Sequence, residues 1–370
     1  MEEIRLQRAR GRLRAKSASA APAGAGAYRG YLRKKRLAVI GIAIATMAIA
    51  CASLGMGTIA LSPADILSVI VGTADAQTTA VIVNMRLPRI LTALVAGIAL
   101  SLSGCAFQSV LRNPLASAST LGVAQGAAFG ASVAIILIAD SGAAAFEGAT
   151  SSVNPVITAA CAFAGAMLST AVILGLSRLR EMTPESIVLA GVALSALFTA
   201  GTTLIQYFAE DSQVAAVVFW TFGDLSRVNW SQLAVMSAVT AVSGTFFLAH
   251  AGSFNAIESG EGLAHGLGVA VGRTRLACMV AASLAAACVI AFCGIINFVG
   301  LVAPHITRRL LGADYRYLMP ASALVGASLL LLADIACHAV VAPLILPISA
   351  ITAFIGAPLF IYLLFKGVSR

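Results

Sequence analysis

The sequence predicts an all-α polytopic membrane protein, and three observations carry this prediction. Of the 370 residues, 59% are hydrophobic and 11% are charged, whereas a soluble domain has about 25% charged residues; the mean hydropathy is +0.95. Apolar runs of about 20 residues recur along the chain, long enough to cross a hydrocarbon layer of roughly 30 Å as helices. The runs are continuously apolar and do not alternate, which argues against membrane β-strands.

Ten membrane-spanning helices are expected from these runs. The predicted spans are residues 37–61, 90–109, 120–139, 156–177, 186–208, 231–251, 274–294, 296–311, 318–338 and 348–366. Pro63, Asp65 and Asp75 interrupt the segment 62–84, so we do not expect it to cross. The apolar stretch 213–224 is too short to span and is expected to be a re-entrant or surface helix.

The basic residues predict the orientation of these spans. Eleven of the 24 Lys and Arg residues lie within residues 1–36, an arm that is expected to be disordered and cytoplasmic. With the amino terminus inside, ten spans return the carboxyl terminus inside and leave 21 of the 24 basic residues cytoplasmic, as the positive-inside rule requires. The same rule accounts for the net charge of +9 without a nucleic-acid partner.

Arg86, Arg89 and Arg227 are the three basic residues that this topology places outside. Arg86 and Arg89 flank Pro88 in the sequence RLPR, directly before an apolar run. Long basic side chains at span ends commonly reach back to the membrane interface. Alternatively, the two arginines are sockets for acidic groups on an external partner. The residues alone do not choose between these interpretations.

Several motifs of catalysis and ATP binding are absent from the sequence. The stretch GVAVGRTR at 268–275 has glycines but no G-K-[ST] ending, so no P-loop is expected. HExxH, GxSxG and paired catalytic carboxylates are also missing, and we expect neither an enzyme nor a cofactor. Carboxylates within spans are scarce, Asp334 being the best candidate, which disfavours the alternative of an ion-coupled secondary transporter.

The small residues are expected to serve packing. The seven cysteines include no CxxC pair, and we interpret them as buried packing residues, with no disulfide or metal site. The stretch GVAQGAAFG places Gly122, Gly126 and Gly130 on one helix face, which favours close approach of another helix.

The inner loop 252–275 is the longest cytoplasmic connection between the predicted spans. Its apolar residues are spaced among glutamates and glycines, which suits one or two short helices on the inner surface. The loop is either an ordinary linker or a docking surface, and the spacing of its apolar residues favours docking.

Three stretches resemble the FecCD family, the permease subunits of ABC importers for iron-siderophores, haem and cobalamin. They are RLPRILTALVAGIALSLSGCAFQSVLRNPLASASTLGVAQGAAFG (86–130), INFVGLVAPHITRRLLGADYRYLMPASALVGASLLLLADI (296–335) and LPISAITAFIGAPLFIYLLFK (346–366). The resemblance covers about residues 37–367. It implies a ten-span permease domain over residues 37–370, in a bacterial-type plasma (inner) membrane. Its expected partners are a second permease copy, giving a homodimer, two cytoplasmic ATPase subunits and an extracytoplasmic substrate-binding protein. The cargo stays open among the three chelates.

The resemblance also implies site residues. Arg86 and Arg89 would pair with glutamates of the binding protein, and His338 occupies the position where the family usually has a third docking arginine. The cytoplasmic gate would comprise Asn113, Pro114, Leu115 and Thr183. Coupling to the ATPase would use Ile257, Glu261, Leu263, Leu267 and Gly268 in the loop 252–272, with Gly268 ending a helix.

Overall fold

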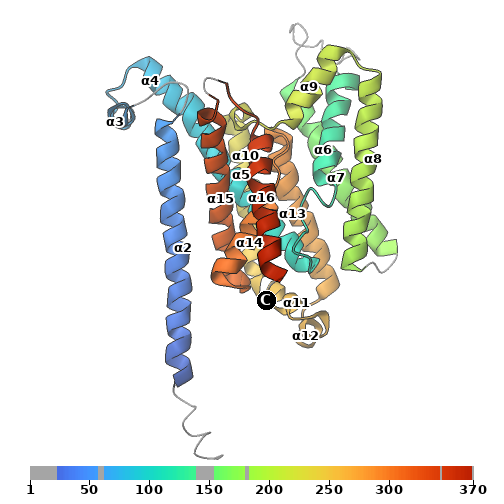
Figure 1. Ribbon diagram of the computed structural model, residues 1–370. Helices are drawn as coiled ribbons and strands as arrows, with labels where there is room; N and C mark the ends of the chain where they lie inside the picture. The colour runs from blue at the N-terminus through green and yellow to red at the C-terminus, as the bar shows by residue number, and fades with distance from the viewer. Residues whose placement is uncertain (1–22, 57–61, 139–153, 180–182, 342–343, 369–370) are drawn as a thin grey trace, which may run out of the picture.

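The computed structural model describes residues 23–56, 62–138, 154–179, 183–341 and 344–368, and all regular secondary structure within these ranges is helical. The long helices run roughly parallel to one another in a single bundle, with α2 at one side and α7 and α8 at the other (Figure 1). The longer helices are α2 (Ala23–Gly55), α5 (Leu87–Val110), α7 (Pro155–Leu179), α8 (Pro184–Tyr207), α10 (Trp230–Ala249), α13 (Val271–Cys293), α14 (Val299–Leu311), α15 (Tyr315–Ala339) and α16 (Ile348–Val368). The shorter elements are α3 (Pro63–Val71), α4 (Ala76–Ala80), the π-helix η1 (Val81–Arg86), α6 (Val123–Ser132), the π-helix η2 (Val133–Ile138), α9 (Asp211–Thr221), the 3₁₀ turn η4 (Leu225–Arg227), α11 (Ala251–Glu258) and α12 (Glu261–Gly266).

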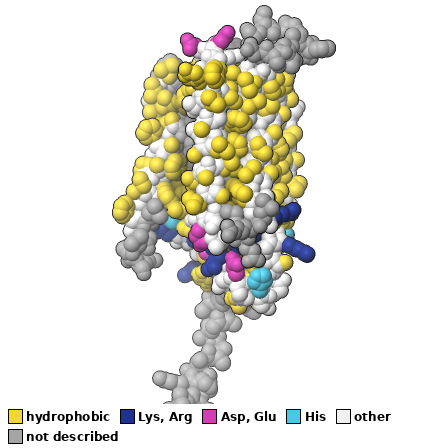
Figure 2. Space-filling view, turned by 90° about the vertical axis from the view of Figure 1, so that its right-hand side faces the viewer, with side chains coloured by type: hydrophobic (Ala, Val, Ile, Leu, Met, Phe, Trp, Pro, Cys, Tyr) yellow, Lys and Arg dark blue, Asp and Glu magenta, His cyan; other side chains and the backbone are white. Residues whose placement is uncertain are grey.

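The two ends of the bundle differ in their elements and their charge. We call them the α9 end, which carries α3, α4 and α9, and the α12 end, which carries α11 and α12 (Figure 1). On the face that Figure 2 shows, hydrophobic side chains cover the middle of the molecule, and Lys and Arg gather near the α12 end. An apolar belt between charged ends is the surface that a bilayer requires.

The predicted spans agree with the helices to within a few residues for most of the chain. Within the described residues, seven helices are long and apolar enough to cross a membrane, and two shorter apolar helices cover Val123–Ile138 and Ile348–Tyr362. The stretch 213–224 does form a short helix, α9. The inner loop forms two short helices, α11 and α12, as its pattern of apolar residues suggested.

Two predicted boundaries were wrong: the end of the basic arm and the start of the second span. Residues 23–36 of the basic arm, expected to be disordered, are the first turns of α2, and residues 1–22 lie outside the described residues. The Leu, Lys and Arg residues before residue 37 are good helix formers, so the helix extends cooperatively beyond its apolar part. The second predicted span also begins too late, because helix continues from Ala76 to Val110.

RLPR therefore lies within a helix and not before one. Pro88 has no amide hydrogen to donate, and its ring would collide with the carbonyl four residues earlier in a regular helix. The π-helix η1 ends two residues before Pro88, and the amide of Leu87 bonds to the carbonyl of Ile82, five residues back. This wider turn accommodates the proline and keeps the chain helical through the motif.

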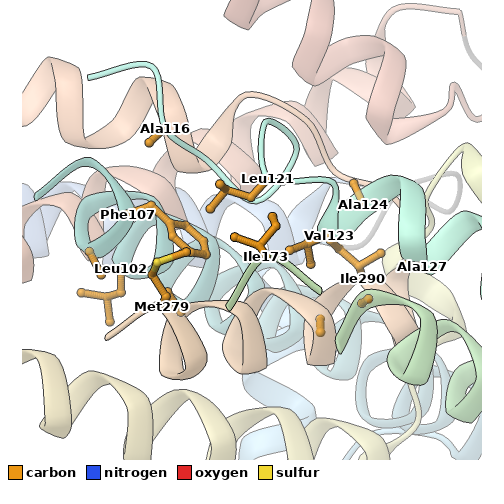
Figure 3. Packing of buried hydrophobic residues seen from close by; sticks show 14 of the residues in the cluster. Leu102, Phe107, Ala116, Leu121, Val123, Ala124, Ala127, Ile173, Met279 and Ile290 are labelled. Atoms are coloured by element: carbon orange, nitrogen blue, oxygen red, sulfur yellow. The ribbon is translucent and has the colours of Figure 1, made fainter. Parts of the chain in front are cut away.

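Glycines allow the central helices to approach closely. A Cβ on Gly126 would overlap the carbonyl of Gly165 on α7, and a Cβ on Gly104 of α5 would overlap that of Gly300 on α14. The glycine stripe predicted at 122–130 thus packs α6 against α7. Around these crossings lies the main core, with Phe107, Leu121 and Ile173 at its centre (Figure 3).

The helical path is broken between α13 and α14. Residues 294–298 are not helical, Gly294 has φ +76°, and Phe298 begins α14 with φ +65°. The turn after α9 packs against this break: the amide of Asp224 donates to the carbonyl of Cys293 at 2.7 Å. Non-helical backbone at membrane depth needs such cover from protein, because lipid offers it no hydrogen bonds.

Candidate functional site

A cavity of about 760 Å³ opens at the α9 end of the bundle. Its walls come from η1 and the start of α5, the turn after α9, the end of α15 and the start of α16. The arginine, aspartate and histidine side chains that line it are Arg86, Arg89, Asp224, Arg227, Asp334 and His338. The structure thus brings the three predicted docking residues together, although the chain separates Arg89 from His338 by more than 200 residues.

Arg89 is engaged within the protein. Its Nε and Nη2 donate to Oδ1 of Asp334 at 2.9 and 2.7 Å, and the two side chains are only 17% and 9% exposed. His338 Nδ1 donates to the Asp334 carbonyl at 2.8 Å, which leaves Nε2 to accept from Nη1 of Arg89. Arg89 is therefore neutralised by Asp334 and oriented by His338, an arrangement that sequence spacing did not predict.

Arg86 is also in contact with a neighbouring element. Its Nη1 donates to the carbonyl of Leu54 at the end of α2. That carbonyl belongs to the last turn of a helix, where main-chain acceptors have no intrahelical partner. Arg86 thus caps α2 from the side while lining the cavity.

The predicted gate residues form turns at the α12 end. Asn113 Oδ1 accepts from the amide of Leu115 at 2.9 Å, and the Asn113 carbonyl accepts from Ala116 at 3.1 Å. This Asn-Pro turn leaves Pro114 and Leu115 exposed. Thr183 caps α8 by accepting from the amide of Ser186 at 3.3 Å. The hydrogen bonds of both predicted sets are local, and none joins Thr183 to the Asn113 turn among the described residues.

The predicted coupling residues divide into two groups. Ile257 is fully buried in a small cluster between α11, α12 and the start of α13, so it holds the two short helices together. Leu263 and Leu267 are 55% and 65% exposed, one helical turn apart. Gly268 has φ +81° and ends α12, with its amide on His265 and the next amide on Ala264. This pair of bonds is a Schellman motif, as predicted for a glycine cap.

Charged side chains tie the short helices to the bundle. Glu258 of α11 accepts from Arg308 Nη1 at 2.8 Å and from the Tyr315 hydroxyl at 3.1 Å, and Arg308 Nη2 donates to that hydroxyl at 2.8 Å. Glu261 of α12 pairs with Arg275, whose Nε donates to the carbonyl of Val110 at 3.0 Å. These links could not be predicted from the sequence, because the order of residues does not say which side chains meet once the short helices pack on the bundle.

An apolar helical bundle with charged ends defines the chain as a polytopic membrane protein. The FecCD transport family matches residues 29–366. The chain belongs to this family.

Relatives and a solved structure agree with that assignment. An ABC transporter permease protein of Methanocaldococcus jannaschii is 45% identical over 93% of this chain and 98% of its own length. The hemin transport system permease of Yersinia pestis is 34% identical over 76% of this chain and 82% of its own length. One similar solved structure is described as an inward-facing conformation of a metal-chelate type ABC transporter. Its TM-score is 0.78 and its identity 31%, and the match covers 90% of this chain and 99% of that chain. Other relatives are named as permeases for Fe(3+)-citrate in Bacillus subtilis and cobalamin in Halobacterium salinarum.

Proposed function

We propose that the chain is the membrane subunit of an ABC importer for a metal chelate such as a ferric siderophore, haem or a corrinoid. The observation that carries the proposal is the family match over residues 29–366, nearly the whole chain. Two copies enclose the path, two ATPase subunits bind on the cytoplasmic side, and a binding protein delivers the chelate from outside. The membrane is the plasma membrane of a bacterial-type cell.

The proposed topology has ten spans with both termini inside. The seven long apolar helices, the two shorter apolar segments and α14 supply these spans. The α12 end then faces the cytoplasm and the α9 end faces outside, in keeping with the gathering of Lys and Arg at the α12 end (Figure 2).

Docking of the binding protein is proposed at the cavity of the α9 end. Arg86 and Arg89 would meet its acidic side chains, and His338 would act by orienting Arg89. An arginine already paired with Asp334 offers less net positive charge than a free one, so docking at Arg89 requires an incoming carboxylate to share or displace that partner.

The gate and the coupling surface are proposed at the α12 end. The exposed turn of Asn113, Pro114 and Leu115 would narrow the inner mouth of the path, together with Thr183 at the start of α8. Leu263 and Leu267 would pack against the ATPase, because they are the exposed apolar residues of α12 and its C-cap. Ile257, Glu261 and Gly268 would keep α12 in the shape that fits.

Transport in proteoliposomes tests the function. The chain, reconstituted with its ATPase and supplied with the loaded binding protein, should import the chelate only with ATP and irrespective of ionophores. The alternative, an ion-coupled secondary transporter, would move solute down an ion gradient without the ATPase. Comparing a ferric siderophore, haemin and cobalamin under identical conditions would identify the cargo.

Copurification tests the coupling surface. Leu263→Glu with Leu267→Glu should release the ATPase, since two charges would replace the apolar contact. Ser259→Glu, at an exposed polar position next to α11, is the matched control and should leave the complex intact. Retention of the ATPase by the double variant would contradict the assignment of α12.

A further inference from the structure

The arginines that line the cavity of the α9 end differ in how strongly each is already paired within the protein. Arg89 is paired with Asp334 at 2.7 Å, and its side chain is 17% exposed. Arg86 has a helix carbonyl as an acceptor. Arg227, on the turn η4, is 35% exposed, and the nearest carboxylate oxygen, that of Asp224, lies 3.8 Å away. Arg227 is thus more exposed and less tightly paired than Arg89.

The pairing of Arg227 with Asp224 leaves most of its charge available. Asp224 is itself 43% exposed, and exposed ion pairs contribute about 0–1 kcal/mol because water screens them. Asp224 already has a structural role, since its Oδ1 accepts from the amide of Ser226 at 2.8 Å and begins the turn η4. A carboxylate from outside therefore has little to displace at Arg227.

The turn that carries Arg227 is held in place. The Nη2 of Arg227 donates to the carbonyl of Phe219 at 2.9 Å. The amide of Asp224 is bound to the end of α13, and Ser349 at the start of α16 donates to the carbonyl of Phe222 at 3.1 Å. The guanidinium is therefore presented from a fixed backbone, which lowers the entropy lost when a partner binds.

We infer that Arg227 is a docking contact of the α9 end and that it binds an acidic side chain of the protein that docks there. The inference rests on the proposed function, because that protein is the binding protein of the importer. Among the described arginines that line the cavity, Arg227 is exposed and Arg86 and Arg89 are half-buried, and Arg89 is largely neutralised by Asp334. Neither RLPR nor the position of His338 identifies Arg227, which lies on a different element.

Because Asp224 lies beside Arg227, neutralising each residue in turn should change the affinity for the binding protein in opposite directions. Removing the positive charge with Arg227→Gln should weaken binding of the purified binding protein to the reconstituted transporter by about tenfold, with most of the loss in the association rate at low salt. Removing the negative charge with Asp224→Asn should strengthen binding by a few fold, since the asparagine oxygen still accepts from Ser226. Both effects should shrink at high salt.

Two further variants separate charge from structure. Arg227→Lys retains the charge and should bind nearly as well as the unsubstituted chain, and Arg316→Gln at the opposite end should change nothing. Unchanged binding by Arg227→Gln, or equal losses for the Lys and Gln variants, would overturn the inference. Failure of the unsubstituted chain to bind any binding protein would instead overturn the proposed function itself.

Discussion

Arg89 and Asp334 form the most enclosed ion pair that the described part of the chain contains. Asp334 looked from the sequence like the best candidate for a lone carboxylate within a span. It is instead the partner of Arg89, at 2.7 Å. Its Oδ1 accepts two hydrogen bonds from the Arg89 guanidinium, so the carboxylate serves a contact between α5 and α15.

Truncating either partner should be costly, and truncating both should cost less than the sum of the two single losses. Asp334→Ala leaves the Arg89 guanidinium with no carboxylate in a mostly buried site, and we expect it to destabilise the protein by about 2–3 kcal/mol. Arg89→Ala with Asp334→Ala should cost clearly less than the sum of the two single variants, as in other coupled pairs. Thermal unfolding in detergent gives the stability of the unsubstituted chain, the two single variants and the double variant. Additive losses would mean that the two side chains do not stabilise each other.

At the scale of the elements, close helix crossings depend on particular glycines. Gly104→Ala should force α5 away from α14, because the added methyl would overlap the carbonyl of Gly300, and we expect a loss of about 2–3 kcal/mol. Gly175 on α7 has open space around its Cβ position. Gly175→Ala is therefore the matched control and should be neutral or slightly stabilising. The measurement is the melting temperature of each variant in detergent. Equal melting temperatures for Gly104→Ala and Gly175→Ala would contradict the packing argument.

The short helix α11 is positioned to transmit motion to the bundle. Glu258 contacts Arg308 near the end of α14 and Tyr315 at the start of α15, so a displacement of α11 pulls on both helices. In an ATP-driven importer, Glu258→Arg should leave ATP hydrolysis in place and lower the transport per ATP by about tenfold, the size of a coupling free energy near 1.4 kcal/mol.

A charge swap is the control for this link. Glu258→Arg with Arg308→Glu should restore part of the transport per ATP, because the pair re-forms with reversed polarity. Arg309→Gln, at the exposed neighbour of Arg308, should behave like the unsubstituted chain. If the swap restores nothing while the ATPase stays bound, the contact does not carry the coupling.

For the whole molecule, sequence predicted the helices far better than the contacts between them. Apolar runs locate the spans because nearly every residue of a helix that crosses the hydrocarbon layer must be apolar. The π-turn before Pro88 escaped prediction because residues 62–84 were expected to be too interrupted to continue the span. The break at 294–298 falls between the predicted spans 274–294 and 296–311, and only the structure shows that the turn after α9 covers it. The pairing of Arg89 with Asp334 escaped because the order of residues along the chain does not say which side chains meet. Likewise, Ile257 has the spacing of a docking residue, and only the packing of α11 on α12 reveals that it is buried.

Chemical labelling tests the orientation of the whole bundle. Ser226 is exposed and lines the cavity of the α9 end, and Ser259 is exposed between α11 and α12. In intact spheroplasts, a membrane-impermeant maleimide should label Ser226→Cys at once and Ser259→Cys only after permeabilisation, because the proposed topology places the basic α12 end in the cytoplasm. The unsubstituted chain controls for its seven native cysteines, five of which are buried. Labelling of Ser259→Cys in intact cells would invert the topology and would move the cavity of Arg86, Arg89 and Arg227 to the cytoplasmic side, where no external binding protein could reach it.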